Sequence, residues 1–178
     1  MKPIRHIVLG RFAPIHNGHQ LLITAMLEKY GSENCGIIIG SSNLSINPRT
    51  PFSFDARKKF VITLFPKVRL FDIEDIEEDL QVQRIETLEI WQANLKYMEK
   101  SCGETWIFCG GSDDDLRDMK KDFSTEIIIN RSIEGNQVSG TFVRKMLAEK
   151  NYREIENLVP PMVYDDIVKE YKKNSELF

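Results

Sequence analysis

Apolar and polar positions follow two patterns along this chain, which together predict parallel strands separated by helices. Short apolar runs, several of them bounded by glycine, predict buried strands at residues 4–9, 35–40, 68–71, 105–109 and 126–129. Apolar residues at helical spacing predict helices at residues 20–30, 54–65, 85–100 and 162–173, and another opens within 138–144. We therefore expect an α/β fold: a Rossmann-like open parallel sheet flanked by helices, with C-terminal helices.

The turn between the first strand and the first helix holds residues suited to phosphate binding. It reads Gly10-Arg11-Phe12-Ala13-Pro14-Ile15-His16-Asn17-Gly18-His19. In open α/β sheets such turns bind phosphates, because free N–H groups and the positive end of the helix dipole meet there. With Asn17 as the N-cap, both histidines face one anion, Gly18 admits a ligand to the backbone and Arg11 adds a fork of donors. The alternative is two solvated histidines beside an ordinary helix cap.

A second stretch, Val138-Ser139-Gly140-Thr141-Phe142-Val143-Arg144, offers a similar anion cradle. Ser139 or Thr141 can cap the helix that opens there, and Gly140 exposes backbone N–H groups. Arg144 follows Thr141 at i+3, on the same helical face. Taken alone, the stretch is also typical of an ordinary N-cap.

Three further segments have two interpretations each. Residues 41–53 form a long, polar, proline-punctuated loop after the second strand, either a functional loop or an irregular connection, and Ser53 is placed to cap the next helix. Gly110-Gly111-Ser112 after the fourth strand admits a ligand or forms a plain turn and cap. The acidic run of residues 72–79 is interpreted as a solvated face, with a metal role as the lesser alternative.

Composition narrows the class of protein. With 178 residues, 42% hydrophobic and 29% charged, the chain is expected to form a single domain, residues 1–178, with a proper core. A net charge of −3 implies no general attraction to nucleic acid or membrane. No apolar run has the length of a transmembrane helix, and the start lacks the apolar segment of a signal peptide. Three cysteines without a CxxC pair favour a reduced, cytoplasmic compartment, with Cys35 and Cys109 as core residues.

The motifs resemble a known family. Arg11-Phe12-x-Pro14-x-His16-x-Gly18-His19 resembles the HxGH signature of the nucleotidylyltransferase superfamily, most of all its nicotinamide-nucleotide adenylyltransferase branch of the archaeal type. Ser139-Gly140-Thr141-x-x-Arg144 is similar to the S-x-T-x-x-R signature, and Leu158-Val159-Pro160 to the close of archaeal-type members. Gly40-Ser41-Ser42-Asn43, Pro51-Phe52-Ser53 and Arg57 resemble a loop of that branch. The chain departs from it with Ser45-Ile46-Asn47, where members often carry Ser-His-Thr.

The motifs and the resemblance together assign three groups of residues. The group expected to act on the phosphates in catalysis is Arg11, His16, His19 and Arg144. The group expected to bind ATP is Gly10, Phe12, Gly18, Gly110, Gly111, Ser139, Gly140 and Thr141. The group expected to bind nicotinamide mononucleotide is Ser41, Ser42, Asn43, Arg49, Arg57 and Trp91. Arg49 has the alternative of a solvated loop residue, and Trp91 that of a core residue rather than a platform for the pyridine ring.

The resemblance implies the transfer of adenylate from ATP to nicotinamide mononucleotide, giving NAD and pyrophosphate. It implies Mg²⁺ on the ATP phosphates and no metal ligand in the protein. Family members often form rings or smaller assemblies, so a homo-oligomer is compatible with the chain. Two alternatives stay open: a sister enzyme acting on nicotinate mononucleotide, phosphopantetheine, flavin mononucleotide or a glycerol phosphate, and a non-catalytic nucleotide-binding or sensing module.

Overall fold

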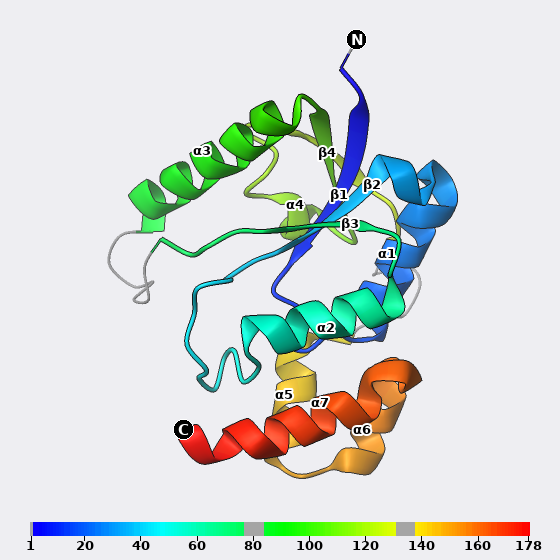
Figure 1. Ribbon diagram of the computed structural model, residues 1–178, viewed down its shortest axis with the longest axis vertical. Helices are drawn as coiled ribbons and strands as arrows, with labels where there is room; N and C mark the ends of the chain where they lie inside the picture. The colour runs from blue at the N-terminus through cyan, green and yellow to red at the C-terminus, as the bar shows by residue number, and fades with distance from the viewer. Residues whose placement is uncertain (1, 77–83, 131–137) are drawn as a thin grey trace.

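The computed structural model describes residues 2–76, 84–130 and 138–178 and centres on a sheet of five parallel strands (Figure 1). The strands lie in the order β3-β2-β1-β4-β5. Their bounds are Ile4–Gly10 for β1, Cys35–Ile39 for β2, Arg69–Asp72 for β3, Thr105–Gly110 for β4 and Ser124–Ile127 for β5. The predicted open parallel sheet is confirmed. Because the chain builds outward on one side of β1 and then on the other, the strand order reverses between β1 and β4, where open sheets bind ligands.

The last strand is displaced from its predicted position at residues 126–129. Strand β5 pairs with β4 from Ser124, opposite Ile107, to Ile127, opposite Gly110. Since β4 ends at Gly110, the ladder has no partner beyond that pair. The backbone N–H of Ile128 still donates to the carbonyl of Gly110 at 3.0 Å, but Ile128 lies outside the strand.

The helices are α1 (Asn17–Tyr30), α2 (Phe54–Leu64), α3 (Arg84–Cys102), α4 (Asp113–Leu116), α5 (Gly140–Ala148), α6 (Tyr152–Leu158) and α7 (Pro161–Asn174). Two short 3₁₀ segments, η1 (Ser32–Asn34) and η2 (Ser175–Leu177), complete the described elements. Ser53 caps α2, because its side chain accepts from the N–H of Ala56 at 3.2 Å. The expected cap of α1 is wrong by one residue: His16 holds the N-cap position, and Asn17 is the first helical residue. Helix α6 lies in a stretch for which the sequence pattern predicts no helix.

Side chains that alternate along the strands build one core on each face of the sheet. Val8, Ile37 and Cys109 belong to a cluster that includes residues of α1, α2 and the C-terminal helices α5–α7. Ile7 and Ile38 belong to a second cluster with residues of α3 and α4. Figure 1 accordingly shows α1 and α3 on opposite sides of the sheet. This alternation explains why strands buried on both faces carry continuous apolar runs.

Helix α7 packs on α2 and α6, whereas the sheet or a neighbouring subunit was the expected partner. Its buried face carries Val163, Ile167 and Tyr171. An ion pair of 2.8 Å between Lys59 and Asp166 links α2 to α7 at the surface. Figure 1 shows the C-terminal helices gathered on the outer side of α2. They therefore extend the core on the α1 face.

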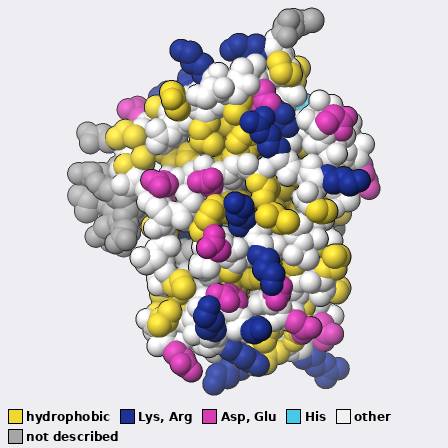
Figure 2. Space-filling model, viewed as in Figure 1, with side chains coloured by type: hydrophobic (Ala, Val, Ile, Leu, Met, Phe, Trp, Pro, Cys, Tyr) yellow, Lys and Arg dark blue, Asp and Glu magenta, His cyan; other side chains and the backbone are white. Residues whose placement is uncertain are grey.

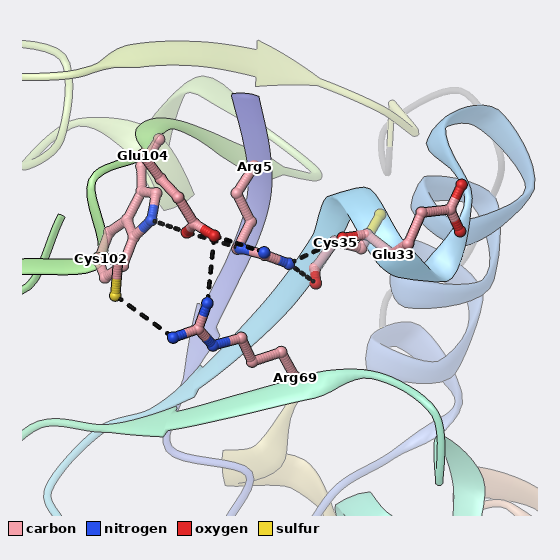
Figure 3. Close-up of polar contacts among 7 residues, drawn as sticks. Arg5, Glu33, Cys35, Arg69, Cys102 and Glu104 are labelled. Carbon is pink, nitrogen blue, oxygen red and sulfur yellow. Dashed lines mark hydrogen bonds and ion pairs between the residues drawn. The ribbon is translucent and has the colours of Figure 1, made fainter. Parts of the chain in front are cut away.

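A polar network joins four strands near their amino ends (Figure 3). Arg5 Nε donates to Glu104 Oε2 at 2.7 Å, and Arg5 Nη1 donates to the carbonyl of Cys35 at 2.9 Å. Arg69 Nη1 reaches Glu104 Oε1 at 3.1 Å, and Trp106 Nε1 donates to Glu104 Oε2 at 3.0 Å. Glu104 is buried, so its charge is compensated by two guanidinium groups. The network therefore lies at the amino ends of the strands, whereas the glycine-rich turns lie at their carboxyl ends.

Acidic and basic side chains are interspersed on the molecular face that Figure 2 shows, without a large area of one sign.

In the acidic run of residues 72–79, Asp72 and Glu74 are exposed, as expected of a solvated face, whereas Ile73 is buried. Residues 77–79 of that run, and the side chain of Ile85, lie outside the described part of the chain. Within the described residues, no helix has the length and apolar character needed to cross a membrane.

Candidate active site

The turn after β1 places two imidazole rings against each other at the start of α1. The rings of His16 and His19 stack with centroids 3.7 Å apart and planes inclined by 22°. The carbonyl of His16 accepts from the backbone N–H groups of His19 and Gln20 at 2.9 and 3.1 Å, which fixes the first helical turn. His16 is 4% exposed, and the ring of Phe12 meets that of His19 edge-on at 4.9 Å. The histidines are therefore held in place before any ligand arrives.

Two glycines make room for close contacts in this arrangement. A Cβ built on Gly18 would lie 3.1 Å from His16 Nδ1, so the His16 ring occupies the space that a side chain would need. A Cβ built on Gly140 would lie 3.1 Å from Arg144 Nη1 and 4.0 Å from His16 Cδ2. The second contact also shows that the start of α5 lies beside the His16 ring. The two predicted anion cradles are thus neighbours in space.

Hydrogen bonds of Arg144 join the two cradles. Arg144 Nη1 donates to the carbonyl of Ala13 at 2.9 Å, and Nη2 donates to Thr141 Oγ1 at 3.1 Å. Ser139, not Thr141, caps α5, because its hydroxyl accepts from the N–H of Phe142 at 3.2 Å. The i+3 relation predicted for Thr141 and Arg144 is therefore present, and it holds the guanidinium across the start of the helix.

Three arginines concentrate positive charge at the site. Burial lowers the pKa of Arg144, and the nearby charges of Arg11 and Arg49 lower it further. The pKa of Arg11 is also lowered by burial and by Arg49, while Asp75 opposes this shift. Guanidinium groups that depress one another's pKa lie in a common positive field. Such a field stabilises a polyanion, and phosphate oxygens match the planar donors of arginine.

Two adjacent cavities open beyond the carboxyl ends of the strands. The larger, of about 1010 Å³, is lined in part by Arg11, Ser41 and Arg49. The smaller, of about 360 Å³, is lined by members of both cradles and of the glycine turn after β4: His16, Gly18, His19, Gly110, Gly111, Ser139 and Gly140. Leu9, Trp91 and Asp118 line both. Many of the residues expected for two different ligands thus border two adjacent cavities that share part of their lining.

Trp91 meets both of its expected alternatives in part. It is half-buried and packs against the core cluster that includes residues of α3 and α4, and it also lines both cavities, so the position allows a platform for an aromatic ring. Its neighbour Gln92 is buried, and the Nε2 of Gln92 donates to the carbonyl of Asp118. Asp118 itself was not predicted as a site residue. Asp118 follows α4 and belongs to none of the motifs, so no sequence signal pointed to it.

Several predicted ligand-binding residues lie elsewhere than expected, and those that line neither cavity are Phe12, Ser42, Asn43, Arg57, Thr141 and Arg144. Gly10 borders the larger cavity instead of the smaller one, and Phe12 is buried in the core. The side-chain amide of Asn43 bonds both backbone groups of Asp75: its Nδ2 donates to the carbonyl and its Oδ1 accepts from the N–H, each at 2.9 Å. Ser42 hydrogen-bonds through its backbone N–H to the carbonyl of Ile73 at 3.1 Å. Ser42 and Asn43 therefore shape the loop rather than face the cavities.

Arg57 also departs from its expected place, because its guanidinium donates to backbone carbonyls beneath the loop.

Gly110 has a packing role as well as a place in the smaller cavity. A Cβ there would lie 2.7 Å from Leu116 Cγ, so a larger residue would displace that core side chain. Arg49 is exposed, as a solvated loop residue would be, and it also borders the larger cavity together with Arg11.

Within the described residues, one group of metal-ligand side chains lies together away from the cradles. The ligand atoms of His6, Cys109 and Glu126 fall within 4.8 Å of one another. Both oxygens of Glu126 are held already, by Lys29 Nζ at 2.6 Å and by the hydroxyl of Tyr30 at 2.5 Å. Burial raises the pKa of the Cys109 thiol to about 12, which disfavours the thiolate that a metal would need.

Comparison with known proteins adds a family match over most of the chain. A family model described as cytidylyltransferase-like matches residues 7–156. A similar curated protein is the nicotinamide-nucleotide adenylyltransferase of Methanospirillum hungatei JF-1, which is 25% identical over 164 residues. That match covers 90% of this chain and 84% of the relative.

Solved structures with a similar fold include two enzymes of pyridine-nucleotide chemistry. One is a bifunctional NMN adenylyltransferase/ADP ribose pyrophosphatase from Francisella tularensis complexed with AMP and a manganese ion, with a TM-score of 0.65 and 21% identity. This chain is covered to 97% but spans only about half, 52%, of that protein. The other is the Plasmodium falciparum nicotinic acid mononucleotide adenylyltransferase, with a TM-score of 0.58, 18% identity, and 97% and 98% of the two chains covered. At these identities the likeness establishes the fold.

Proposed function

This chain belongs to the cytidylyltransferase-like family, and from that premise we propose that it is an adenylyltransferase that joins ATP to nicotinamide mononucleotide. The products are NAD and pyrophosphate. One observation carries the proposal: the smaller cavity borders both anion cradles, the larger one is lined by three arginines (Arg11, Arg49 and Arg117) and by the loop after β2, and Trp91 lines both. Two adjacent sites that share lining residues suit a reaction between two nucleotides. The Methanospirillum hungatei relative, named for this activity, supports the same assignment.

The attacking group in this reaction is a phosphate, which is ionised at neutral pH and needs no general base. The protein must hold the acceptor phosphate in line with the α-phosphorus of ATP and stabilise charge on the equatorial and leaving oxygens. The stacked pair His16 and His19 serves the ATP phosphates, with His19 closest to the α-phosphate. No covalent intermediate with the protein is required.

The second cradle is assigned to the leaving pyrophosphate. Ser139 and Thr141 lie at the start of α5, and Arg144 is bonded to both Thr141 and the turn after β1. A guanidinium held across the two cradles reaches the β- and γ-phosphates while His16 and His19 contact the α-phosphate. Arg11, which lines the larger cavity, serves phosphate positioning. Charge that develops on the departing oxygens is then met by donors already in place.

The larger cavity is assigned to the acceptor mononucleotide. Arg11 and Arg49 supply its phosphate with planar donors, and Trp91 supplies a face on which the pyridine ring can stack. Ser41 lines the same cavity, whereas Ser42 and Asn43 hold the loop that forms its wall. Gly110 and Gly111 border the smaller cavity, where the adenosine of ATP is assigned.

Mg²⁺ is assigned to ATP as part of the substrate. A divalent ion on the phosphates neutralises charge and orients the leaving group, so it requires no ligand set of its own in the protein. The Francisella tularensis neighbour, complexed with AMP and manganese, supports a nucleotide that arrives with a divalent ion.

The test is pyrophosphate release with ATP, Mg²⁺ and a panel of acceptors: nicotinamide mononucleotide, nicotinate mononucleotide, flavin mononucleotide and phosphopantetheine. Fast release only with a pyridine mononucleotide is expected, and the ratio between the two pyridines defines acceptor preference. Release with another acceptor would retain the chemistry and replace the substrate. Measurable ATP binding without release from any acceptor would indicate a nucleotide-binding module instead.

A further inference from the structure

Arg57 is fully buried, and its charge is directed at the backbone. Its Nη1 donates to the carbonyls of Arg11 and Gly40, and its Nη2 donates to the carbonyl of Ser41, each at 2.8 Å. The first carbonyl belongs to the turn after β1, and the other two belong to the turn after β2. One side chain therefore ties together two turns that are distant in sequence.

Both turns contain a residue in the left-handed region of backbone space. Phe12 has φ of 51° and Ser41 has φ of 56°, values that favour glycine. Such a conformation persists only where the surroundings enforce it. The bonds of Arg57 reach the carbonyl just before Phe12 and the carbonyls on either side of the Ser41 backbone. Arg57 thus holds the peptide group before Phe12 and the peptide groups on both sides of Ser41.

The two turns carry side chains of the larger cavity, whereas Arg57 does not line it. Arg11 and Ser41 border that cavity from the turns that Arg57 holds. Arg57 itself sits on α2, which Ser53 caps and which packs into the core through Phe60 and Val61. Burial lowers the pKa of Arg57 to about 10, so the group remains protonated at neutral pH. The guanidinium of Arg57 is thus a fixed cation that contacts the two turns bordering the larger cavity without lining the cavity itself.

We propose that Arg57 is a positioning residue for the acceptor: it locks the turns after β1 and β2 in the geometry that presents Arg11 and Ser41 to the pyridine mononucleotide. This inference rests on the function proposed above. The planar fork of arginine is needed, because a lysine ammonium is a point charge that cannot reach three carbonyls at once with the same geometry. The Arg57→Lys substitution keeps the charge and most of the stem, so it removes the fork specifically.

The test compares Arg57→Lys with Lys58→Ala, a change at the exposed neighbour on the same helix. We expect Arg57→Lys to lower kcat/KM for the acceptor by roughly 10–100-fold, mainly through KM, because the wall of the acceptor site shifts. The KM for ATP should stay within about twofold, since none of the residues lining the smaller cavity is bonded to Arg57. Lys58→Ala should match the wild type in every parameter.

A second readout is independent of activity. The N–H of Gly40 donates to the carbonyl of Gly10 at 3.0 Å, and the N–H of Ser42 donates to Ile73 at 3.1 Å. Hydrogen exchange at these two amides should be at least about tenfold faster in Arg57→Lys, while Ile37–Ile39 of β2 keep their protection. If Arg57→Lys folds poorly, Arg57→Ala with added methylguanidinium replaces it, and recovery of protection and acceptor KM is expected.

Faster exchange together with a raised acceptor KM supports the inference. Unchanged exchange at Gly40 and Ser42 overturns it, and so does faster exchange with an unchanged acceptor KM. An equal rise in the KM values for ATP and acceptor would indicate a general structural role and would also overturn it. A wild-type chain that releases no pyrophosphate would reject the proposed function, whereas the exchange experiment would still decide whether Arg57 holds the turns.

Discussion

Arg144 donates from Nη1 to the carbonyl of Ala13 at 2.9 Å, across 131 residues of sequence. This bond joins the turn after β1 to the start of α5, so two separate helix beginnings form one surface. A guanidinium has five N–H donors, and its bonds to Ala13 and Thr141 leave others for a ligand. Two motifs that are far apart in the sequence are therefore neighbours in the fold.

Replacing Arg144 with lysine should lower kcat/KM for ATP by about 10²–10³-fold, because one ammonium cannot hold both cradles and also meet the leaving phosphates. Initial rates of pyrophosphate release at varied ATP concentration measure the effect. Arg153→Lys, at an exposed position of α6, is the matched control and should behave as the wild type. Rates within a factor of about two of wild type for Arg144→Lys would contradict the assigned role.

His19→Ala should still bind ATP but lose about 10²–10³-fold in kcat, because His19 is assigned to charge that develops on the α-phosphate. Calorimetry with ATP and single-turnover rates separate binding from chemistry. Gln20→Ala is the control, because it alters the next residue of the same helical turn and keeps the backbone bond to His16. Near-normal turnover of His19→Ala would remove His19 from the mechanism.

Trp91 should report acceptor binding through its fluorescence. The chain has two tryptophans, and Trp106 is only 1% exposed in the core of the sheet. Nicotinamide mononucleotide should quench the wild-type emission and leave that of Trp91→Ala, which comes from Trp106, unchanged. Stacking of this kind contributes about 0.5–1.5 kcal/mol, so Trp91→Ala should raise the acceptor KM by up to about tenfold. Equal quenching in both proteins would place the pyridine ring elsewhere.

Glu104 should make the fold sensitive to acid. Its hydrogen bond with Arg5 holds the pKa of Glu104 below the ordinary value of 4.5. Because the folded pKa lies below the unfolded one, the stability that the carboxylate contributes is complete above about pH 4.5 and is lost as the pH falls through the folded pKa. Glu104→Gln should lower the free energy of unfolding at pH 7 by about 3–5 kcal/mol and flatten the decline in acid, as urea denaturation would measure.

The control for that prediction is Asp166→Asn, which removes the exposed ion pair with Lys59. Because both charges are largely solvated, the loss should be at most about 1 kcal/mol. A Glu104→Gln protein no less stable than this control would show that the buried network contributes little to folding.

Side-chain patterns predicted most of the fold because burial on two faces of a parallel sheet leaves a strong apolar signal. The exceptions have local causes. Helix α6 has only Ile155 and Leu158 buried along its seven residues, too few to establish a helical period. The shift of β5 depends on where β4 ends, which the sequence of β5 does not contain.

The candidate site was predictable where side chains line a cavity and unpredictable where they face the backbone. His16, His19 and Ser139 belong to motifs whose spacing alone places them at helix starts. Arg57 and Asn43 bind carbonyl and N–H groups of other segments, and those partners exist only after the chain has folded. A residue pattern records which side chain is present but not which stretch of backbone will pass beside it.

The Glu104 network lies near the amino ends of the strands, and the two cavities lie at the carboxyl ends. Free-energy changes from well-separated substitutions generally add. The loop of residues 41–53 can therefore accumulate changes that lower the free energy of unfolding during evolution, while the distant Glu104 network keeps the folded state stable. A variant with a more stable Glu104 network would accordingly be a suitable starting background for redirecting the enzyme toward new acceptors.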